Sequence, residues 1–207
     1  MKRQSIIYEI IIFLLILVFL IIPPIFTPQI TNIGTLFSWT FPWKQAGLCI
    51  FTLVLYFLSK RLNEKKGIFY PSLIALSLLF FTAIIIKLIT HSAPGENKSI
   101  MPQGGIEVIF CLMTFALSAV YEEIIYRFYF TDALKHLIPV EKKFVVIICE
   151  AAGLIVFAFA HFYLGWASVI NAAVAHVILR FLYKKTNLIW NCVIVHFIYN
   201  VISLILL

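Results

Sequence analysis

The stretch "VYEEIIYRFYF", residues 120–130, places Glu122, Glu123 and Arg127 in an otherwise apolar part of the chain. It overlaps an apolar segment, residues 105–126, that is long enough to cross a bilayer as an α-helix. Ionisable side chains are costly at membrane depth, and those that occur there face the interior of a helix bundle and mark functional sites. The stretch therefore predicts a transmembrane bundle with a polar site inside it.

The composition of the whole chain agrees with a membrane environment. Of 207 residues, 63% are hydrophobic and 12% are charged, and the mean hydropathy is +1.04, which differs strongly from the usual soluble domain. Neither an internal repeat nor a low-complexity linker divides the chain. The net charge of +7 forms no basic stripe interleaved with aromatic residues, so nucleic acid is not an expected partner. The predicted fold class is all-α, a polytopic transmembrane helical bundle in contact with the lipid bilayer.

The hydropathy pattern predicts about seven membrane spans. They cover residues 6–22, 43–59, 69–90, 105–126, 144–162, 166–183 and 188–207. The first span follows Lys2 and Arg3 like a signal peptide, but the "PPIFTPQ" after it lacks a small-residue cleavage site. We therefore expect the first span to be a retained helix of a multi-pass integral membrane protein.

The cationic residues between the spans and near their ends predict the orientation of the chain. Alternate threading puts most of them on one side, namely Lys2, Arg3, Lys60, Arg61, Lys65, Lys66, Arg127, Lys135, Lys142, Lys143, Arg180, Lys184 and Lys185. Only Lys44, Lys87 and Lys98 fall toward the other side. The positive-inside rule then predicts a cytoplasmic N-terminus and an external C-terminus. The short chain without recognisable extra domains favours a prokaryotic plasma membrane.

Several single ionisable residues have simpler interpretations. Glu9 and Glu107 lie near span ends, where interfacial water solvates them. Glu150 lies deeper, has no cation at helical spacing in its own span, and is interpreted as a protonated group without a catalytic role. His176 is interpreted as a hydrogen-bonded packing histidine.

Nucleophilic side chains offer little support for covalent catalysis. Ser118 and Ser168 lack partners at comparable depth, and no cysteine neighbours a histidine on its helical face. The cysteines are interpreted as small buried hydrophobic residues without disulfides or a metal clip; they are Cys49, Cys111, Cys149 and Cys192.

The two adjacent glutamates are expected to differ in role. Glu123 and Arg127 are four residues apart, with the acid N-terminal to the base, which is the favourable order for an ion pair within a helix. Glu122 points about 100° away around the helix. An ion pair that neutralises Glu123 therefore leaves Glu122 free to face another group.

Two further helices carry polar residues at helical spacing. "FAFAH" places Phe157 four residues before His161, and "HFIYN" places His196 four residues before Asn200. Counted from the "PVEKK" turn, Glu122 and His161 lie at roughly 24 and 27 Å along their helices, so they should be level. A carboxylate, two imidazoles and a carboxamide can thus converge inside one bundle.

"EEIIYR", "FAFAH" and "HFIYN", in this order, resemble the three signatures of the CPBP family, which unites type II CAAX prenyl proteases of the Rce1 kind with bacteriocin-processing and immunity proteins. The signatures are EExxxR, FxxxH and HxxxN or D, and the resemblance covers about residues 105–203. It implies an intramembrane glutamic endopeptidase, with residues 105–207 as the catalytic helical core and residues 1–104 as N-terminal helices of unassigned role.

Carried over position by position, the resemblance assigns roles to single residues. Glu122 and His161 would activate a water, while His196 and Asn200 would bind the oxyanion on the scissile carbonyl. Glu123, Arg127 and Phe157 would be supporting residues. The chain departs from the family at Phe128, where glycine is common, and at His176 and Arg180, where small residues are more usual.

The chemistry of peptide hydrolysis asks for the same residue types. A carboxylate and an imidazole can hold and deprotonate a water, and preorganised donors can stabilise the oxyanion. The same Glu122, His161 and His196 could instead bind a catalytic zinc. We expect no cofactor, because no HExxH is present and Asn200 is a poor zinc ligand but a good oxyanion donor.

The substrate is expected to be a peptide or protein, prenylated or otherwise membrane-anchored, in CAAX-type or in leader or bacteriocin processing. The alternative is a non-catalytic bacteriocin immunity protein or membrane scaffold, in which the polar cluster only holds helices together.

Overall fold

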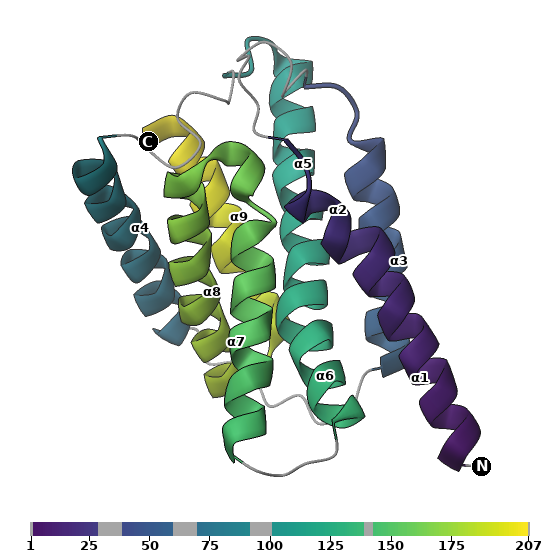
Figure 1. The fold of residues 1–207 in the computed structure, drawn as a ribbon. Coiled ribbons are helices and arrows are strands. Elements are labelled where there is room, and N and C mark those ends of the chain that lie inside the picture. Colours follow the sequence, from purple (N-terminus) through teal and green to yellow (C-terminus); the bar gives the residue numbers. More distant parts are fainter. Residues whose placement is uncertain (1, 29–38, 60–69, 92–100, 139–142, 207) are drawn as a thin grey trace.

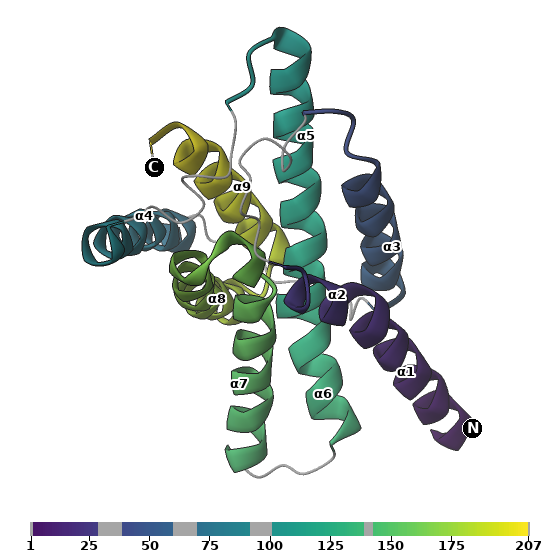
Figure 2. The ribbon, with the colours of Figure 1, turned by 45° about the horizontal axis from the view of Figure 1, so that its top comes forward.

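The computed structural model describes residues 2–28, 39–59, 70–91, 101–138 and 143–206, and in these residues the ordered elements are all helices. Figure 1 shows them as one bundle, with α5, α7, α8 and α9 at its centre, α4 on one flank and α1 to α3 on the other. The view in Figure 2 keeps the same order of helices. The predicted all-α bundle is confirmed.

The N-terminal half supplies the flanks of the bundle. Its helices are α1 (Lys2–Ile16), the π-helical turn η1 (Leu17–Ile21), α2 (Ile22–Ile25), α3 (Trp43–Ser59) and α4 (Tyr70–Thr90). Pro23 and Pro24 lie within α2, which continues directly from η1, so the first helix runs three residues past its predicted end.

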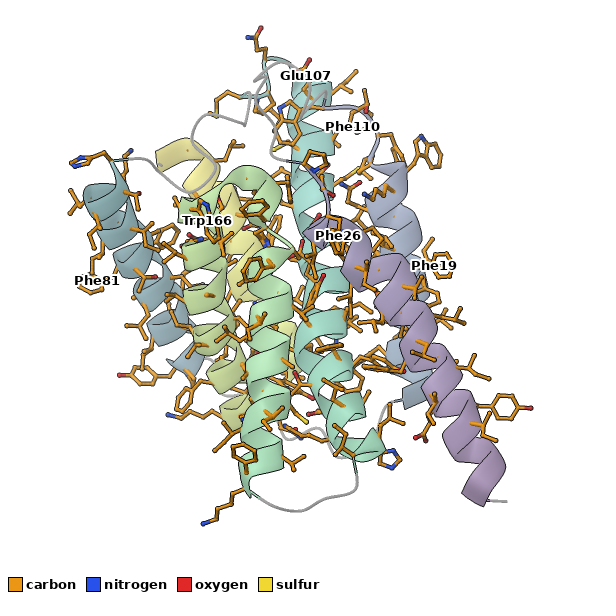
Figure 3. All side chains as sticks on the ribbon, viewed as in Figure 1. Phe19, Phe26, Phe81, Glu107, Phe110 and Trp166 are labelled. Atoms are coloured by element: carbon orange, nitrogen blue, oxygen red, sulfur yellow. The ribbon has the colours of Figure 1, made fainter. Side chains whose placement is uncertain are left out.

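The long central rod that carries "VYEEIIYRFYF" is continuous over Gly105–Leu137. It consists of α5 (Gly105–Glu122), the π-helical segment η3 (Glu123–Phe130) and α6 (Thr131–Leu137). The N–H of Gln103 donates to Glu107 Oε2 at 2.8 Å, which satisfies one of the unpaired amides before the helix. Glu107 lies at the end of the rod, as Figure 3 shows, and its interpretation as a span-end residue is confirmed.

The C-terminal half packs around this rod. It consists of α7 (Lys143–Phe159), the 3-10 turn η4 (Phe162–Leu164), α8 (Trp166–Thr186) and α9 (Ile189–Leu206). Gly165, at φ 97°, allows the sharp reversal into α8, and Asn187, at φ 54°, ends α8 in the left-handed region. The α-helical part of the predicted span 144–162 ends earlier than predicted, because α7 ends at Phe159.

Within the residues that the structure describes, five helical segments are long and apolar enough to cross a membrane: Ile7–Ile25, Tyr70–Thr90, Gly105–Leu137, Lys143–Leu164 and Trp166–Thr186. The other two predicted spans are shorter apolar helices, Trp43–Leu58 and Ile189–Ile205. In Figure 1, α1 begins and α6 ends at one end of the bundle, whereas α9 ends at the opposite end. Several of the cationic residues that predict the orientation lie outside the described residues, so the cytoplasmic side stays a prediction; they are Lys60, Arg61, Lys65, Lys66, Lys98 and Lys142.

The distribution of side chains is that of a protein in lipid. Phe19 and Phe81, labelled in Figure 3, point outward and are 69% and 61% exposed. Glu123 and Arg127 are fully buried. Apolar groups facing outward and charged groups facing inward indicate an integral membrane protein with an intramembrane polar interior.

Candidate active site

Four helical segments bring the predicted site residues together. Glu122 is the last residue of α5, Glu123 the first of η3, and His196 lies in the middle of α9. His161 follows the end of α7 and precedes η4, with φ −100° and ψ 6°. Residues from three separate sequence motifs therefore meet inside the bundle at the level that helix lengths predicted.

The ion pair between Glu123 and Arg127 is present. Arg127 Nη1 lies 2.8 Å from Glu123 Oε1, and both side chains are completely buried. The Arg127 guanidinium also lies 4.0 Å from the centre of the Phe157 ring, a buried cation–π contact. Phe157, the first residue of "FAFAH", therefore supports the cation of the first motif.

His196 joins the third motif to this ion pair. Its Nδ1 lies 2.6 Å from Glu123 Oε1, in a buried position. Because the carboxylate of an ion pair can only accept, His196 donates its Nδ1–H. Glu123 thus contacts both Arg127 and His196 and connects η3 to α9.

Glu122 turns away from this network, as expected. Its Oε2 is buried and has no hydrogen-bond partner among the described residues. This oxygen lies 3.8 Å from His161 Nε2 and 4.0 Å from His196 Nε2. These distances are too long for direct hydrogen bonds and leave a separation that one water can bridge.

The ring nitrogens that face Glu122 can be assigned from their partners. His161 Nδ1 lies 2.9 Å from the carbonyl oxygen of Phe157, which only accepts, so His161 also donates its Nδ1–H. In the neutral form, the lone pair of His161 is then on Nε2, which faces Glu122. A water between Glu122 and His161 would meet two hydrogen-bond acceptors. It could therefore donate one O–H group to each of them.

Asn200 lies one helical turn after His196 on α9 and is half-buried. Within the described part of the chain, no hydrogen bond of its carboxamide is recorded, whereas neighbouring Tyr199 donates to Asn171 Oδ1 at 3.1 Å. Unlike the other predicted residues, Asn200 is assigned to the site by its helical spacing from His196 and not by a contact.

Three tyrosines next to Glu122 were missed at the sequence level. Tyr121, Tyr126 and Tyr163 all lie close enough to Glu122 to interact with its charge. The Tyr126 ring also contacts Phe157, with ring centres 5.1 Å apart. In an aromatic-rich apolar chain, nothing in their spacing distinguishes these tyrosines from lipid-facing ones.

Glu150 corrects the sequence interpretation. It was expected to lack a matching cation and to be protonated, but it contacts three cations from other helical segments. Its carboxylate lies 2.6 Å from Lys135, 2.9 Å from Arg180 and 2.8 Å from Lys184. The partners were missed because they are 15, 30 and 34 positions away, and only spacing within one helix was considered.

His176 is a packing histidine, but the expected hydrogen bonds are not found. It is 2% exposed, and neither ring nitrogen has a partner among the residues that the structure describes. Its ring lies 5.5 Å from that of Phe157. The four cysteines are free and buried, as predicted.

In the described ranges, no group of three or more His, Cys, Asp or Glu side chains is arranged to hold a metal ion. Glu122, His161 and His196 are nevertheless the donors that a zinc ion would use here. Among these three residues, Glu122 Oε2 lies 3.8 Å from His161 Nε2 and 4.0 Å from His196 Nε2.

Comparison with known protein families identifies the C-terminal half of the chain. Residues 104–202 match the family model described as "Type II CAAX prenyl endopeptidase Rce1-like". No curated protein and no solved structure matches the chain. The matched segment contains all three motifs, so the resemblance identified from "EEIIYR", "FAFAH" and "HFIYN" is confirmed.

Proposed function

We propose that the chain is an intramembrane endopeptidase that cleaves its substrate with a water held by Glu122 and His161, a proposal supported by the match of residues 104–202 to the Rce1-like family model. The observation that carries the proposal is Glu122 Oε2, a buried oxygen without a partner among the described residues, 3.8 Å from His161 Nε2. A buried acceptor without a partner is costly unless another molecule satisfies it.

The proposed reaction begins with deprotonation of this water. One O–H of the water donates to Glu122 and the other to His161 Nε2. Glu122 takes the proton as the water oxygen attacks the carbonyl carbon of the scissile bond. When the tetrahedral intermediate collapses and the C–N bond breaks, Glu122 returns the proton to the leaving amine. The residue is regenerated without a covalent intermediate.

The oxyanion of that intermediate is proposed to lie between α9 and the substrate. The side-chain NH₂ of Asn200 can donate to it, and so can Nε2–H of His196 in the form that carries protons on both ring nitrogens. In that form, Nδ1–H still bonds to Glu123. Donors held in place before charge develops are more effective in a buried site than in water.

Glu123, Arg127 and Phe157 are assigned a supporting role. The buried ion pair, the cation–π contact and the 2.6 Å bond to His196 hold the start of η3 against α7 and α9. This arrangement lets Glu123 stay neutralised while the adjacent Glu122 remains available for chemistry.

The proposed substrate is a CAAX-type peptide, whose prenylated cysteine would lie in the bilayer next to the bundle. The proposed setting is a prokaryotic plasma membrane with the N-terminus in the cytoplasm. No metal cofactor is assigned, and residues 105–207 are proposed as the catalytic core.

The test uses the full chain in liposomes with a peptide that ends in a farnesylated CAAX sequence. Mass spectrometry should detect a shortened farnesylated product with wild type and none with Glu122→Gln of equal thermal stability. The unprenylated peptide and a leader peptide are run in parallel. Cleavage of the leader peptide alone would move the substrate to the leader class, and absence of all cleavage would favour an immunity protein or scaffold.

A further inference from the structure

From the contacts of Arg180, we infer that this residue is a positioning residue that holds the π-helical segment η3 in register and thereby aims the two glutamates; this inference rests on the proposed function. Arg180 lies in α8, between the second and third motifs in sequence and outside all three of them. Its side chain is only 7% exposed, and it donates from Nη1 to the carbonyl oxygen of Arg127. It therefore reaches the backbone of the segment that carries Glu123.

The bond to the Arg127 carbonyl lies where the backbone changes from π to α geometry. Segment η3 ends at Phe130 and α6 begins at Thr131. The preceding carbonyl, that of Tyr126, accepts from the hydroxyl of Thr131 at 3.4 Å. Two consecutive carbonyls are thus bonded by side chains near the end of the π-helical segment. Such segments are rare and are frequently found at functional sites.

Arg180 itself is fixed from two other helices. Its Nε donates to Glu150 Oε2 at 2.9 Å, and its Nη2 donates to Asp132 Oδ1 at 2.9 Å and to Glu150 Oε1 at 3.1 Å. The planar guanidinium can make these bonds together with the carbonyl bond because its five N–H groups point in fixed directions. The guanidinium therefore links α6, α7 and η3.

Arg127 connects Arg180 to the proposed site. Arg127, whose carbonyl Arg180 binds, forms the ion pair with Glu123, and Glu123 accepts from His196. Glu122 immediately precedes this segment. A change in the winding of η3 rotates Glu122 and Glu123 relative to the imidazoles, so Arg180 affects chemistry without touching the reacting atoms.

The experiment compares Arg180→Gln, Arg180→Lys and Lys184→Gln in the full chain. Lys184→Gln is the matched control, because Lys184 also binds Glu150, at 2.8 Å, but is half-exposed. Amide hydrogen exchange is measured over residues 123–131 and, for comparison, over α9. Single-turnover cleavage is measured on the folded fraction of each variant.

We expect Arg180→Gln to speed exchange over 123–131 by at least about tenfold, with α9 little changed, and to slow the cleavage step by about 10- to 100-fold with KM within about threefold. Lysine keeps the positive charge but lacks the planar guanidinium that donates to several acceptors at once. Arg180→Lys should therefore recover most of the thermal stability and little of the cleavage rate. Lys184→Gln should match wild type in both measurements.

Wild-type exchange over 123–131 and wild-type rate in Arg180→Lys would overturn the inference, and so would a loss of thermal stability alone in Arg180→Gln. If Arg180→Gln does not fold, Arg180→Lys carries the test. Hydrogen exchange does not depend on proteolysis. Without any wild-type cleavage, local exchange over 123–131 would still test the structural link, and only the proposed function would fail.

Discussion

Replacing each of the two adjacent glutamates by glutamine should have opposite consequences. Glu123→Gln removes the negative charge beside Arg127, whose side chain is fully buried and whose Nε, Nη1 and Nη2 have no hydrogen-bond partner in the described residues, so the ion pair with Glu123 is what compensates its charge. Breaking a buried ion pair typically costs about 3–5 kcal/mol. Because glutamine can still accept from His196, we expect the lower end, about 3 kcal/mol, or roughly 6–12 °C in Tm for a chain of this size.

Glu122→Gln should leave stability nearly unchanged and remove activity. Its Oε2 has no partner among the described residues, and the amide oxygen of glutamine can still accept the hydrogen bond from Tyr121, so we expect a change in Tm within about 2–4 °C, equivalent to about 1 kcal/mol. A general base contributes roughly 10²- to 10⁴-fold to the rate, and glutamine cannot take the proton.

The assay combines thermal unfolding in detergent with single-turnover cleavage normalised to the folded fraction. Equal stability of Glu123→Gln and wild type would refute the assignment of Glu123 to structure. Full activity of folded Glu122→Gln would refute the proposed base.

Three other outcomes are expected. Asn200→Ala should slow single-turnover cleavage by about 10²- to 10³-fold with little change in substrate binding, because an oxyanion donor acts after charge develops; a rate within threefold of wild type would remove that role. Gly153→Ala should lose about 1–3 kcal/mol in an unfolding assay, since an added Cβ would lie 2.6 Å from Thr131 Oγ1, and Thr131→Ala in the same chain should restore part of it; a stable single variant would contradict this packing. A reporter fused after Lys66 should read cytoplasmic and one near Gly95 external, and the reverse would overturn the predicted orientation.

The sequence predicted the convergence of the site because helix geometry is regular. Glu122 and His161 were placed level by counting residues from a shared turn, and their side chains lie 3.8 Å apart. The pairing of Glu123 with Arg127 followed from i,i+4 spacing in the same way. Even the π-helical winding of η3 left this pair intact at 2.8 Å.

Contacts between helices were not predictable by the same reasoning. Glu150 and Arg180 were both visible as ionisable residues within apolar spans, but their partners depend on how α6, α7 and α8 pack. The bond from His196 to Glu123 spans 73 positions. Pairing intramembrane acids with cations on all other helices, instead of on the same helix, would have been the useful signal.

The change from α to π geometry at Glu123 also escaped the sequence analysis. Residues 123–130 read as ordinary helix, since hydropathy and spacing do not distinguish the two windings. The side chains that bond the carbonyls near its end, Thr131 and Arg180, come from the next helical segment and from α8. Such a segment follows from tertiary contacts and not from local preference.

The most direct test of the central claim is single-turnover cleavage of the prenylated peptide before and after exhaustive treatment with a strong chelator. If Glu122 and His161 activate the water themselves, the wild-type rate should be unchanged by the chelator, abolished in Glu122→Gln and strongly reduced in His161→Ala. Loss of wild-type cleavage in chelator, with recovery on addition of zinc, would contradict the account and assign Glu122, His161 and His196 to a metal site.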